Sequence, residues 1–124
     1  MAKRLRIIST SADVVAKSSV LPVSPRKLNL VAKMVRGMRA FDALRALSFC
    51  KKTAAEYVYK TVRSAIANAD MNVSGINQDY LFVREAYVGK AVVLRRTRCR
   101  AKGSGSRILK KFSQLTVVLC ESEV

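Results

Sequence analysis

Small and apolar residues alternate with more polar ones near the start of the chain. They fall at every second position, at Val14, Ala16, Ser18 and Val20. This is the period at which side chains return to one face of a β-strand. Pro22 should end this strand, because proline offers no amide proton to a sheet ladder. The pattern predicts a strand near residues 13–21, preceded by a basic tail at residues 1–12.

A longer period follows and predicts helices. The first helix should begin at Ser24 and Pro25, because serine is a favoured N-cap and proline fits the first helical position. Gly37 should end this helix. Its apolar face would consist of Leu28, Val31, Ala32 and Val35. A short helix is expected at residues 41–48, with its inward positions at Ala43, Leu44 and Leu47.

A third helix is predicted at residues 52–70, where apolar residues recur at helical spacing. Because many of them are small, another element should pack closely against it. The inward set is Ala54, Ala55, Val58, Val62, Ala65, Ile66 and Ala69. Residues 71–79 are polar and predict a loop. Core positions are expected for the phenylalanines Phe41, Phe49 and Phe82, and packing is favoured over base stacking for Tyr57 and Tyr59.

The second half of the chain is rich in β-branched and aromatic residues. Residues 80–94 and 108–120 predict two antiparallel strands, and residues 95–107 predict a long basic tip between them. Arms of about 13 residues at about 3.4 Å each would reach on the order of 40 Å. That length exceeds a small helical body, so the hairpin should project. At the tip, Gly103 and Gly105 fit either a flexible turn or a close approach of the backbone to a binding partner.

Composition shows what such a hairpin could bind. The chain has 124 residues, the size of one domain, with 24 Lys and Arg against 8 Asp and Glu and a net charge of +16. Such a charge repels itself unless a polyanion neutralises it, and nucleic acid is the commonest such partner, ahead of an anionic membrane. No acidic residue lies between Ala86 and Cys120. That span holds nine cations, Lys90, Arg95, Arg96, Arg98, Arg100, Lys102, Arg107, Lys110 and Lys111.

We take these nine residues as candidate RNA ligands, because arginine grips phosphate with two donors and stacks on bases. Charges on neighbouring residues should destabilise a free two-stranded ribbon, so the hairpin should be ordered only where an anion surrounds it. Three further candidates lie on the first helix, Arg26, Lys27 and Arg36. For Arg26 and Lys27, plain exposure to solvent is an equally good interpretation. Lys51, Lys52, Lys60 and Arg63 are weaker candidates.

Other classes of protein fit less well. The chain has no histidine, no phosphate-cradling loop and no close pair of acids outside Glu121 and Glu123, so we expect no enzyme, no metal and no cofactor. Cys50, Cys99 and Cys120 match no disulfide or zinc spacing and should be free thiols in the cytosol. A DNA-binding ribbon or a membrane-surface module remains an alternative. A long, one-sided, acid-free hairpin fits folded RNA better than a single DNA groove.

The motifs carry a family resemblance over residues 14 to 120. Three sets of segments are similar, in order and spacing, to the signatures of the universal ribosomal protein family number twenty-two of the large subunit. They are residues 24–31 with 35–37, residues 51–55 with 64–69, and residues 100–103 with 107–111 and 115–118. The resemblance implies an α+β fold, in which a small body of three helices packs on a three-stranded antiparallel sheet with a long protruding basic β-hairpin. The strand near residues 13–21 would be the third strand.

The resemblance also implies function. Such a protein binds large-subunit ribosomal RNA, assists assembly, contacts neighbouring ribosomal proteins and lines the polypeptide exit tunnel, beside the nascent polypeptide, with a hairpin tip linked to macrolide resistance. Here the tunnel-lining residues would be Arg96, Thr97, Arg98, Cys99, Arg100, Ala101, Lys102 and Gly103. No homo-oligomer is implied, and the length favours a bacterial or organellar ribosome. The chain departs from the family at residues 89–93, at Cys99 for a proline, and at Ser104 for an arginine.

Overall fold

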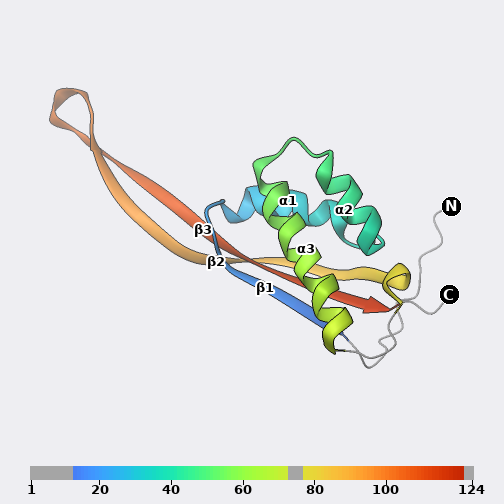
Figure 1. Cartoon of the computed structure of the whole chain (residues 1–124). Helices are drawn as coiled ribbons and strands as arrows, with labels where there is room; N and C mark the ends of the chain where they lie inside the picture. The colour runs from blue at the N-terminus through green and yellow to red at the C-terminus, as the bar shows by residue number, and fades with distance from the viewer. Residues whose placement is uncertain (1–12, 73–76, 122–124) are drawn as a thin grey trace.

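The computed structural model describes residues 13–72 and 77–121, and its elements follow the predicted order (Figure 1). The predicted basic tail at residues 1–12 lies outside the described residues. The strands are β1 (Val14–Leu21), β2 (Leu81–Cys99) and β3 (Gly105–Glu121), and the helices are α1 (Pro25–Val35), α2 (Ala40–Ser48) and α3 (Thr53–Asn72). Two short 3-10 helices cover Gln78–Tyr80 and Ala101–Gly103.

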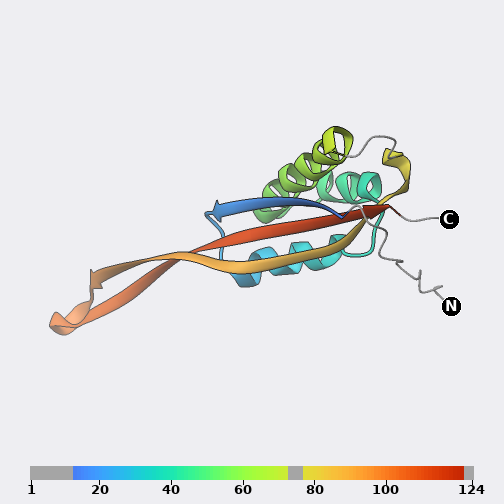
Figure 2. The same cartoon turned by 90° about the horizontal axis from the view of Figure 1, so that it is seen from below.

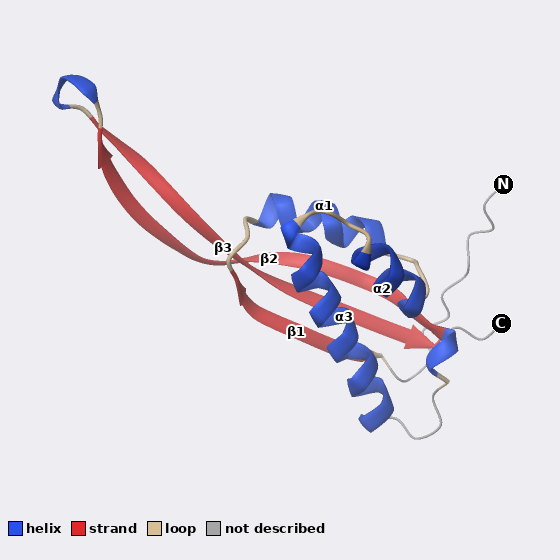
Figure 3. Cartoon of the chain, turned by 45° about the horizontal axis from the view of Figure 1, so that its top comes forward, coloured by secondary structure: helices blue, strands red, loops and turns tan. Residues whose placement is uncertain are grey.

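The three strands form one antiparallel sheet in the order β1-β3-β2, so the predicted third strand is confirmed. All three helices lie on one face of this sheet, with α3 over β1 and β3 and α1 against β2 (Figure 3). Figure 2 shows the opposite face, which no described helix covers. The α+β fold that the resemblance implied is therefore present.

Burial explains why the helical patterns were reliable. The predicted face of α1 is almost fully buried, and every predicted inward residue of α3 is buried as well. The small residues of α3 let it pack against the sheet and against α1 and α2, as expected. Gly37 ends α1 with a φ of +78°, and its N–H donates to the Val83 carbonyl at 2.8 Å. Ser24 occupies the N-cap position, but its hydroxyl makes no capping hydrogen bond.

Four local predictions were wrong. Val20 is 56% exposed and Leu21 is buried, because the β1–β3 register shifts between Ser18 and Leu21 and such a bulge reverses the facing of the residues after it. Phe41 and Phe49 are exposed, because the alanines Ala40 and Ala43 with Leu47 already fill the α2 side of the core. The expected loop is shorter than residues 71–79, since α3 continues through Asn72 and a 3-10 helix follows at Gln78–Tyr80.

The fourth concerns the tip. Residues 95–99 and 105–107 are not loop, because the β2–β3 ladder continues to the pair Cys99 and Gly105. Only residues 100–104 turn, with Lys102 and Gly103 in the left-handed region at φ values of 58° and 69°. A hydrogen bond from the Arg100 N–H to the Ser104 carbonyl, at 2.8 Å, closes the turn. The hairpin extends well beyond the helices, as predicted (Figures 1 and 3).

Candidate nucleic-acid interface

The predicted RNA ligands lie on the surface with their charges uncompensated. All twelve candidate residues are exposed. In the described part of the chain, the ion pairs join Lys60 to Glu56 and Arg84 to Asp13 and Glu85, and they use none of the twelve. Asp13 raises the pKa of Arg84, which lies near the start of β2 and not on the projecting part of the hairpin. Among the described residues no acidic group pairs with the candidates, so their charges are free to bind an outside anion.

The register of the hairpin decides which way these charges point. Residues paired directly across an antiparallel ladder share one face. The pairs Val93–Lys111, Arg95–Leu109 and Thr97–Arg107 lie on one face, and Leu94–Lys110, Arg96–Ile108 and Arg98–Ser106 lie on the other. Each face therefore carries three of these cations. The expectation of a one-sided hairpin was wrong, and the preference for RNA over a DNA groove cannot rest on it.

The same register keeps the cations apart. In these six pairs, each cation lies opposite an aliphatic or hydroxyl side chain and never opposite another cation. Like charges directly opposite would destabilise the ladder. Arg95 and Arg96 are adjacent in sequence but point to opposite faces, as Lys110 and Lys111 do. The self-repulsion expected from the sequence is thus smaller than neighbouring charges suggested.

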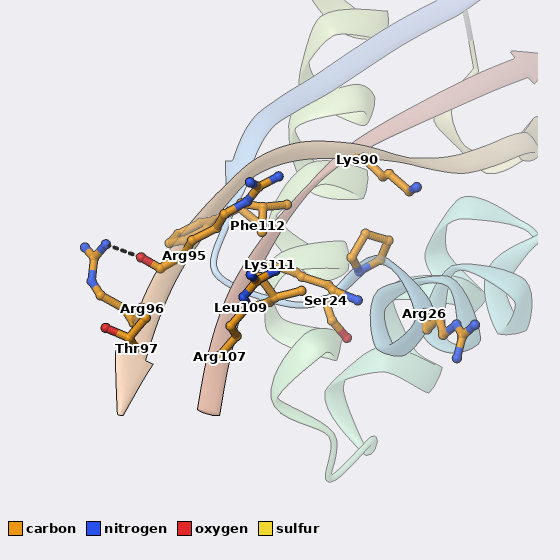
Figure 4. Close-up of a pocket in the computed structure, with 12 residues that line it drawn as sticks. Ser24, Arg26, Lys90, Arg95, Arg96, Thr97, Arg107, Leu109, Lys111 and Phe112 are labelled. Carbon is orange, nitrogen blue, oxygen red and sulfur yellow. Dashed lines mark hydrogen bonds between the residues drawn. The ribbon is translucent and has the colours of Figure 1, made fainter. Parts of the chain in front are cut away.

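A cleft lies between the base of the hairpin and the start of α1 (Figure 4). We call it the hairpin cleft; it has a volume of about 1130 Å³. Its lining residues include no carboxylate and are Ser24, Pro25, Arg26, Lys90, Val93, Arg95, Arg96, Thr97, Arg107, Leu109, Lys111 and Phe112. Figure 4 shows Arg96 pointing away from the other labelled side chains, with its guanidinium on the Arg95 carbonyl at 2.9 Å. The fold thus places Arg26, which is far from the hairpin in sequence, in the lining of the same cleft as the hairpin cations.

Six candidate residues lie outside this cleft. Arg98, Arg100 and Lys102 are at or near the tip, Lys110 is on the other face of the hairpin, and Lys27 lines a separate cleft. Arg36 is engaged within the protein. Its Nε donates to the Ala86 carbonyl at 2.7 Å and its terminal nitrogen donates to Asn29 Oδ1 at 2.8 Å. Contact between Arg36 and RNA stays a prediction.

Sequence reasoning missed Ser113, which positions the cleft without lining it. Ser113 is fully buried on β3, and its hydroxyl donates to the Val23 carbonyl at 2.8 Å. This bond fixes the segment before α1 onto the sheet, next to Ser24. The available signal was a polar residue at an inward position, two residues before the buried Leu115.

The structure also tests the predictions made for the cysteines and for two tyrosines. Cys50 is half-buried, Cys99 is exposed and Cys120 is buried, and all three are free thiols. Burial raises the pKa of Cys120. Tyr57 and Tyr59 pack against the core, as favoured. Within residues 13–72 and 77–121, no three side chains gather as a metal site and no helix is long and apolar enough to cross a membrane.

Comparison with known proteins identifies the family. The family model for "Ribosomal protein L22p/L17e" matches residues 16–120. Three curated relatives are each named large ribosomal subunit protein uL22. The protein of Methylobacterium nodulans is 52% identical over 86% of this chain and 83% of its own length. The protein of Rhodospirillum rubrum is 49% identical over 94% and 90%. The protein of Maricaulis maris is 49% identical over 87% and 85%. The chain therefore belongs to the ribosomal protein L22p/L17e family.

Proposed function

We propose that the chain is a structural constituent of the large ribosomal subunit, that it binds the ribosomal RNA of that subunit, and that it has no catalytic role. Its membership of a ribosomal protein family and the printed names of its relatives support the first part. The observation that carries the second part is the hairpin cleft. There, basic side chains gather that have no ion-pair partner among the described residues, and none of the lining residues is a carboxylate. The protein would act in the ribosome, in the cytoplasm.

The distribution of charge favours folded RNA over the rival partners. A ribbon on a membrane surface or in one DNA groove would need its cations mainly on one face. This hairpin has three on each face over six cross-strand pairs. Arginine and lysine on both faces can be neutralised together only when anions surround the ribbon, as phosphates do inside a large RNA. RNA helices offer little readable base edge to side chains, so specificity would come from shape.

We further propose that the hairpin supports subunit assembly and that its tip lines the polypeptide exit tunnel. The tip residues are Arg96 to Gly103, and the projection of the hairpin beyond the helices gives them the necessary reach (Figure 1). Neighbouring ribosomal proteins and the nascent polypeptide would be the protein partners. A homo-oligomer forms no part of this proposal.

A binding experiment tests the proposal. The full chain is titrated with large-subunit ribosomal RNA, duplex DNA or anionic vesicles at about 50 mM and about 200 mM salt. We expect preference for the RNA and a steep loss of affinity with salt, because phosphate contacts release counterions. Arg95→Glu with Arg107→Glu, both in the hairpin cleft, should weaken RNA binding.

A matched control separates local contacts from net charge. Arg45→Glu with Lys17→Glu changes the net charge by the same amount at two exposed positions that line neither of the two clefts. Its effect on RNA binding should be much smaller. Equal affinity for DNA or for vesicles, or equal effects of the two double variants, would contradict the proposal.

A further inference from the structure

The two strands of the hairpin differ in length between the same two cross-strand pairs. Between the pair Lys90–Ser113 and the pair Cys99–Gly105, β2 advances nine positions and β3 advances eight. One residue of β2 therefore has no partner of its own in β3. The place of this residue decides the facing of every residue beyond it, because side chains alternate between the two faces with a period of two.

The extra residue forms a β-bulge at the base of the hairpin. The register shifts between Lys90 and Val93, so that Ala91 and Val92 together oppose Phe112. Val92 is turned to solvent, with 56% of its surface exposed. We call this feature the hairpin bulge. It lies in the segment where the chain departs from the family signature.

Contacts on both sides of the hairpin bulge fix its position. On the body side, the buried Ser113 hydroxyl donates to a carbonyl of the segment before α1 at 2.8 Å. In the next pair the Gln114 side chain lies over Gly89, so closely that a Cβ atom added there would be 2.5 Å from Gln114 Nε2. On the tip side, the bond from the Arg100 N–H to the Ser104 carbonyl closes the turn. The extra residue is therefore confined to the ladder between these two points.

A regular ladder would bring two arginines into opposition. Continued from the pair at Lys90 without a bulge, the alternation would place Arg96 directly opposite Arg107. Such like-charge pairs destabilise a ladder. The hairpin bulge advances β2 by one residue, so that Arg96 lies opposite Ile108 instead. The separation of the cations across the ladder therefore depends on this one residue.

The hairpin bulge also decides which cations face α1. Ser113 identifies that face, because it is buried against the segment before α1 and lies on the same side of β3 as Lys111. A regular ladder would turn four cations toward α1, namely Arg96, Arg98, Arg107 and Lys111. The actual ladder turns three toward α1, and these line the hairpin cleft with Arg26: Arg95, Arg107 and Lys111.

We propose that the hairpin bulge determines the specificity of RNA binding, because it fixes which cations of the hairpin face α1. The two faces carry equal numbers of these cations at different positions, so general attraction to a polyanion does not distinguish them. An RNA surface with phosphates at matching positions does distinguish them. Ala91 and Val92 carry no charge and act as positioning residues. This inference rests on the proposed function, since it presupposes that RNA is the partner.

Two variants of unchanged net charge test the proposal. Deletion of Ala91 gives the two strands equal length, so it removes the bulge but keeps the cross-strand pairs and the facing of the cations. Insertion of one serine between Phe112 and Ser113 also removes the bulge and keeps the pairs beyond it, but it exchanges the two faces. The two variants therefore share the loss of the bulge and differ in facing alone.

Chemical cross-linking verifies the facing. In a background with Cys99→Ser and Ser24→Cys, a short bifunctional maleimide should join position 24 to Arg95→Cys in the deletion variant. In the insertion variant it should join position 24 to Arg96→Cys instead.

Binding of each full chain is then measured with transcribed large-subunit ribosomal RNA and with duplex DNA. The deletion variant should keep the wild-type preference for RNA. The insertion variant should lose RNA affinity by at least about tenfold, which corresponds to about 1.4 kcal/mol. Its affinity for DNA and the salt dependence of that affinity should stay unchanged, because the number of exposed cations is the same.

The outcomes separate this inference from the proposed function. If wild-type protein fails to prefer the RNA, the proposed function falls, and the role of the bulge falls with it. If wild-type protein prefers the RNA but the two variants bind it equally, whether well or poorly, only the role of the bulge is refuted.

Neutral substitutions keep the proposal testable if circular dichroism shows that either variant does not fold. Arg95→Gln with Arg107→Gln removes two cations from the face toward α1, and Arg96→Gln with Arg98→Gln removes two from the other face. Hydroxyl-radical footprints of the two double variants should lose protection at different nucleotides of the RNA. Loss at the same nucleotides would mean that the two faces are interchangeable and would refute the proposal.

Discussion

The Arg36 guanidinium and the Ala86 carbonyl are joined by a hydrogen bond of 2.7 Å between residues 50 positions apart in the sequence. The same guanidinium binds Asn29 Oδ1 at 2.8 Å, so Arg36 ties the end of α1 to β2. After Ala86, β2 continues into the hairpin, where it carries Lys90 and Arg95. The bond therefore helps to fix the orientation of the helix that carries Arg26 relative to the strand that forms the other side of the hairpin cleft.

Replacing Arg36 with lysine should destabilise the fold. Lysine keeps the charge but cannot direct two planar donors at Ala86 and Asn29 together, so we expect a loss of about 1 kcal/mol in the free energy of unfolding. Urea denaturation measures it. Arg26→Lys, at an exposed position of the same helix, should change stability by less than about 0.5 kcal/mol. Unchanged stability with weaker RNA binding would instead make Arg36 an RNA ligand.

The helices and the sheet could be predicted because burial imposes a period on the sequence. The face of α1 around Leu28 and Val31 and the inward alanines of α3 are buried where the spacing put them. The bulge after Ser18 was not predictable, since a register shift depends on how β1 meets β3 and leaves no local sequence pattern. The prediction that Phe49 is in the core failed for a similar reason, because hydrophobicity alone does not say whether the core still has room for the side chain.

The candidate site could be predicted in composition but not in arrangement. The run of cations marked the hairpin, yet the division of Arg95 and Arg96 between two faces follows from the register, which composition does not give. The ladder reaches Cys99, and the three arginines of β2 that it passes through do not by themselves mark a strand. Contacts such as Ser113 to Val23 join residues 90 positions apart, and only the tertiary structure reveals them.

Ser113→Ala should loosen the segment of residues 22–24, which leads into α1 beside the hairpin cleft. The substitution leaves the Val23 carbonyl without the hydroxyl that now reaches it, and an unsatisfied part-buried acceptor costs about 1–3 kcal/mol. Urea denaturation gives the stability, and RNA titration should show weaker binding even though no cation has changed. Ser19→Ala, at an exposed position of β1, is the neutral comparison. If both alanine variants retain full affinity, the segment of residues 22–24 needs no such anchor.

Leu109→Lys should reveal why cations avoid direct opposition in the hairpin. The new ammonium would face Arg95 across the ladder, and such like-charge pairs destabilise by about 0.2–1 kcal/mol. Leu109→Gln is the uncharged comparison. The difference between the variants should shrink at about 1 M salt, where screening acts within about 3 Å. Chemical shifts of residues 93–111 report the strand population, and a salt-independent difference would point to packing instead.

The hairpin should be less protected than the body in the free protein. A two-stranded ribbon without a packed face is marginal in water, and the helices of the body do not cover the projecting part (Figure 3). Amides of residues 94–99 and 105–110 should therefore exchange with solvent quickly, while those of Leu115, Val117 and Leu119 exchange slowly. Adding ribosomal RNA should slow the hairpin amides selectively. Equal protection of hairpin and core without RNA would remove the reason to invoke a surrounding polyanion.

Cys99 offers a direct probe of where the tip lies. It is exposed at the end of β2, whereas Cys120 is buried with a raised pKa, so less of its reactive thiolate is present near neutral pH. In the free chain, Cys99 should react quickly with both a small maleimide and a bulky polymer-linked maleimide, and Cys120 should react with neither until the protein unfolds.

In assembled large subunits, a tip that lines a narrow aqueous tunnel should admit only the small reagent to Cys99. Mass spectrometry of the labelled chain gives the extent at each cysteine, with Cys99→Ser as the blank. Rapid labelling by the bulky reagent would place the tip on the outer surface of the particle, and no labelling by either reagent would mean that RNA encloses the tip completely. Only selective labelling fits an open channel beside residues 96–103, because size exclusion requires both water access and surrounding walls.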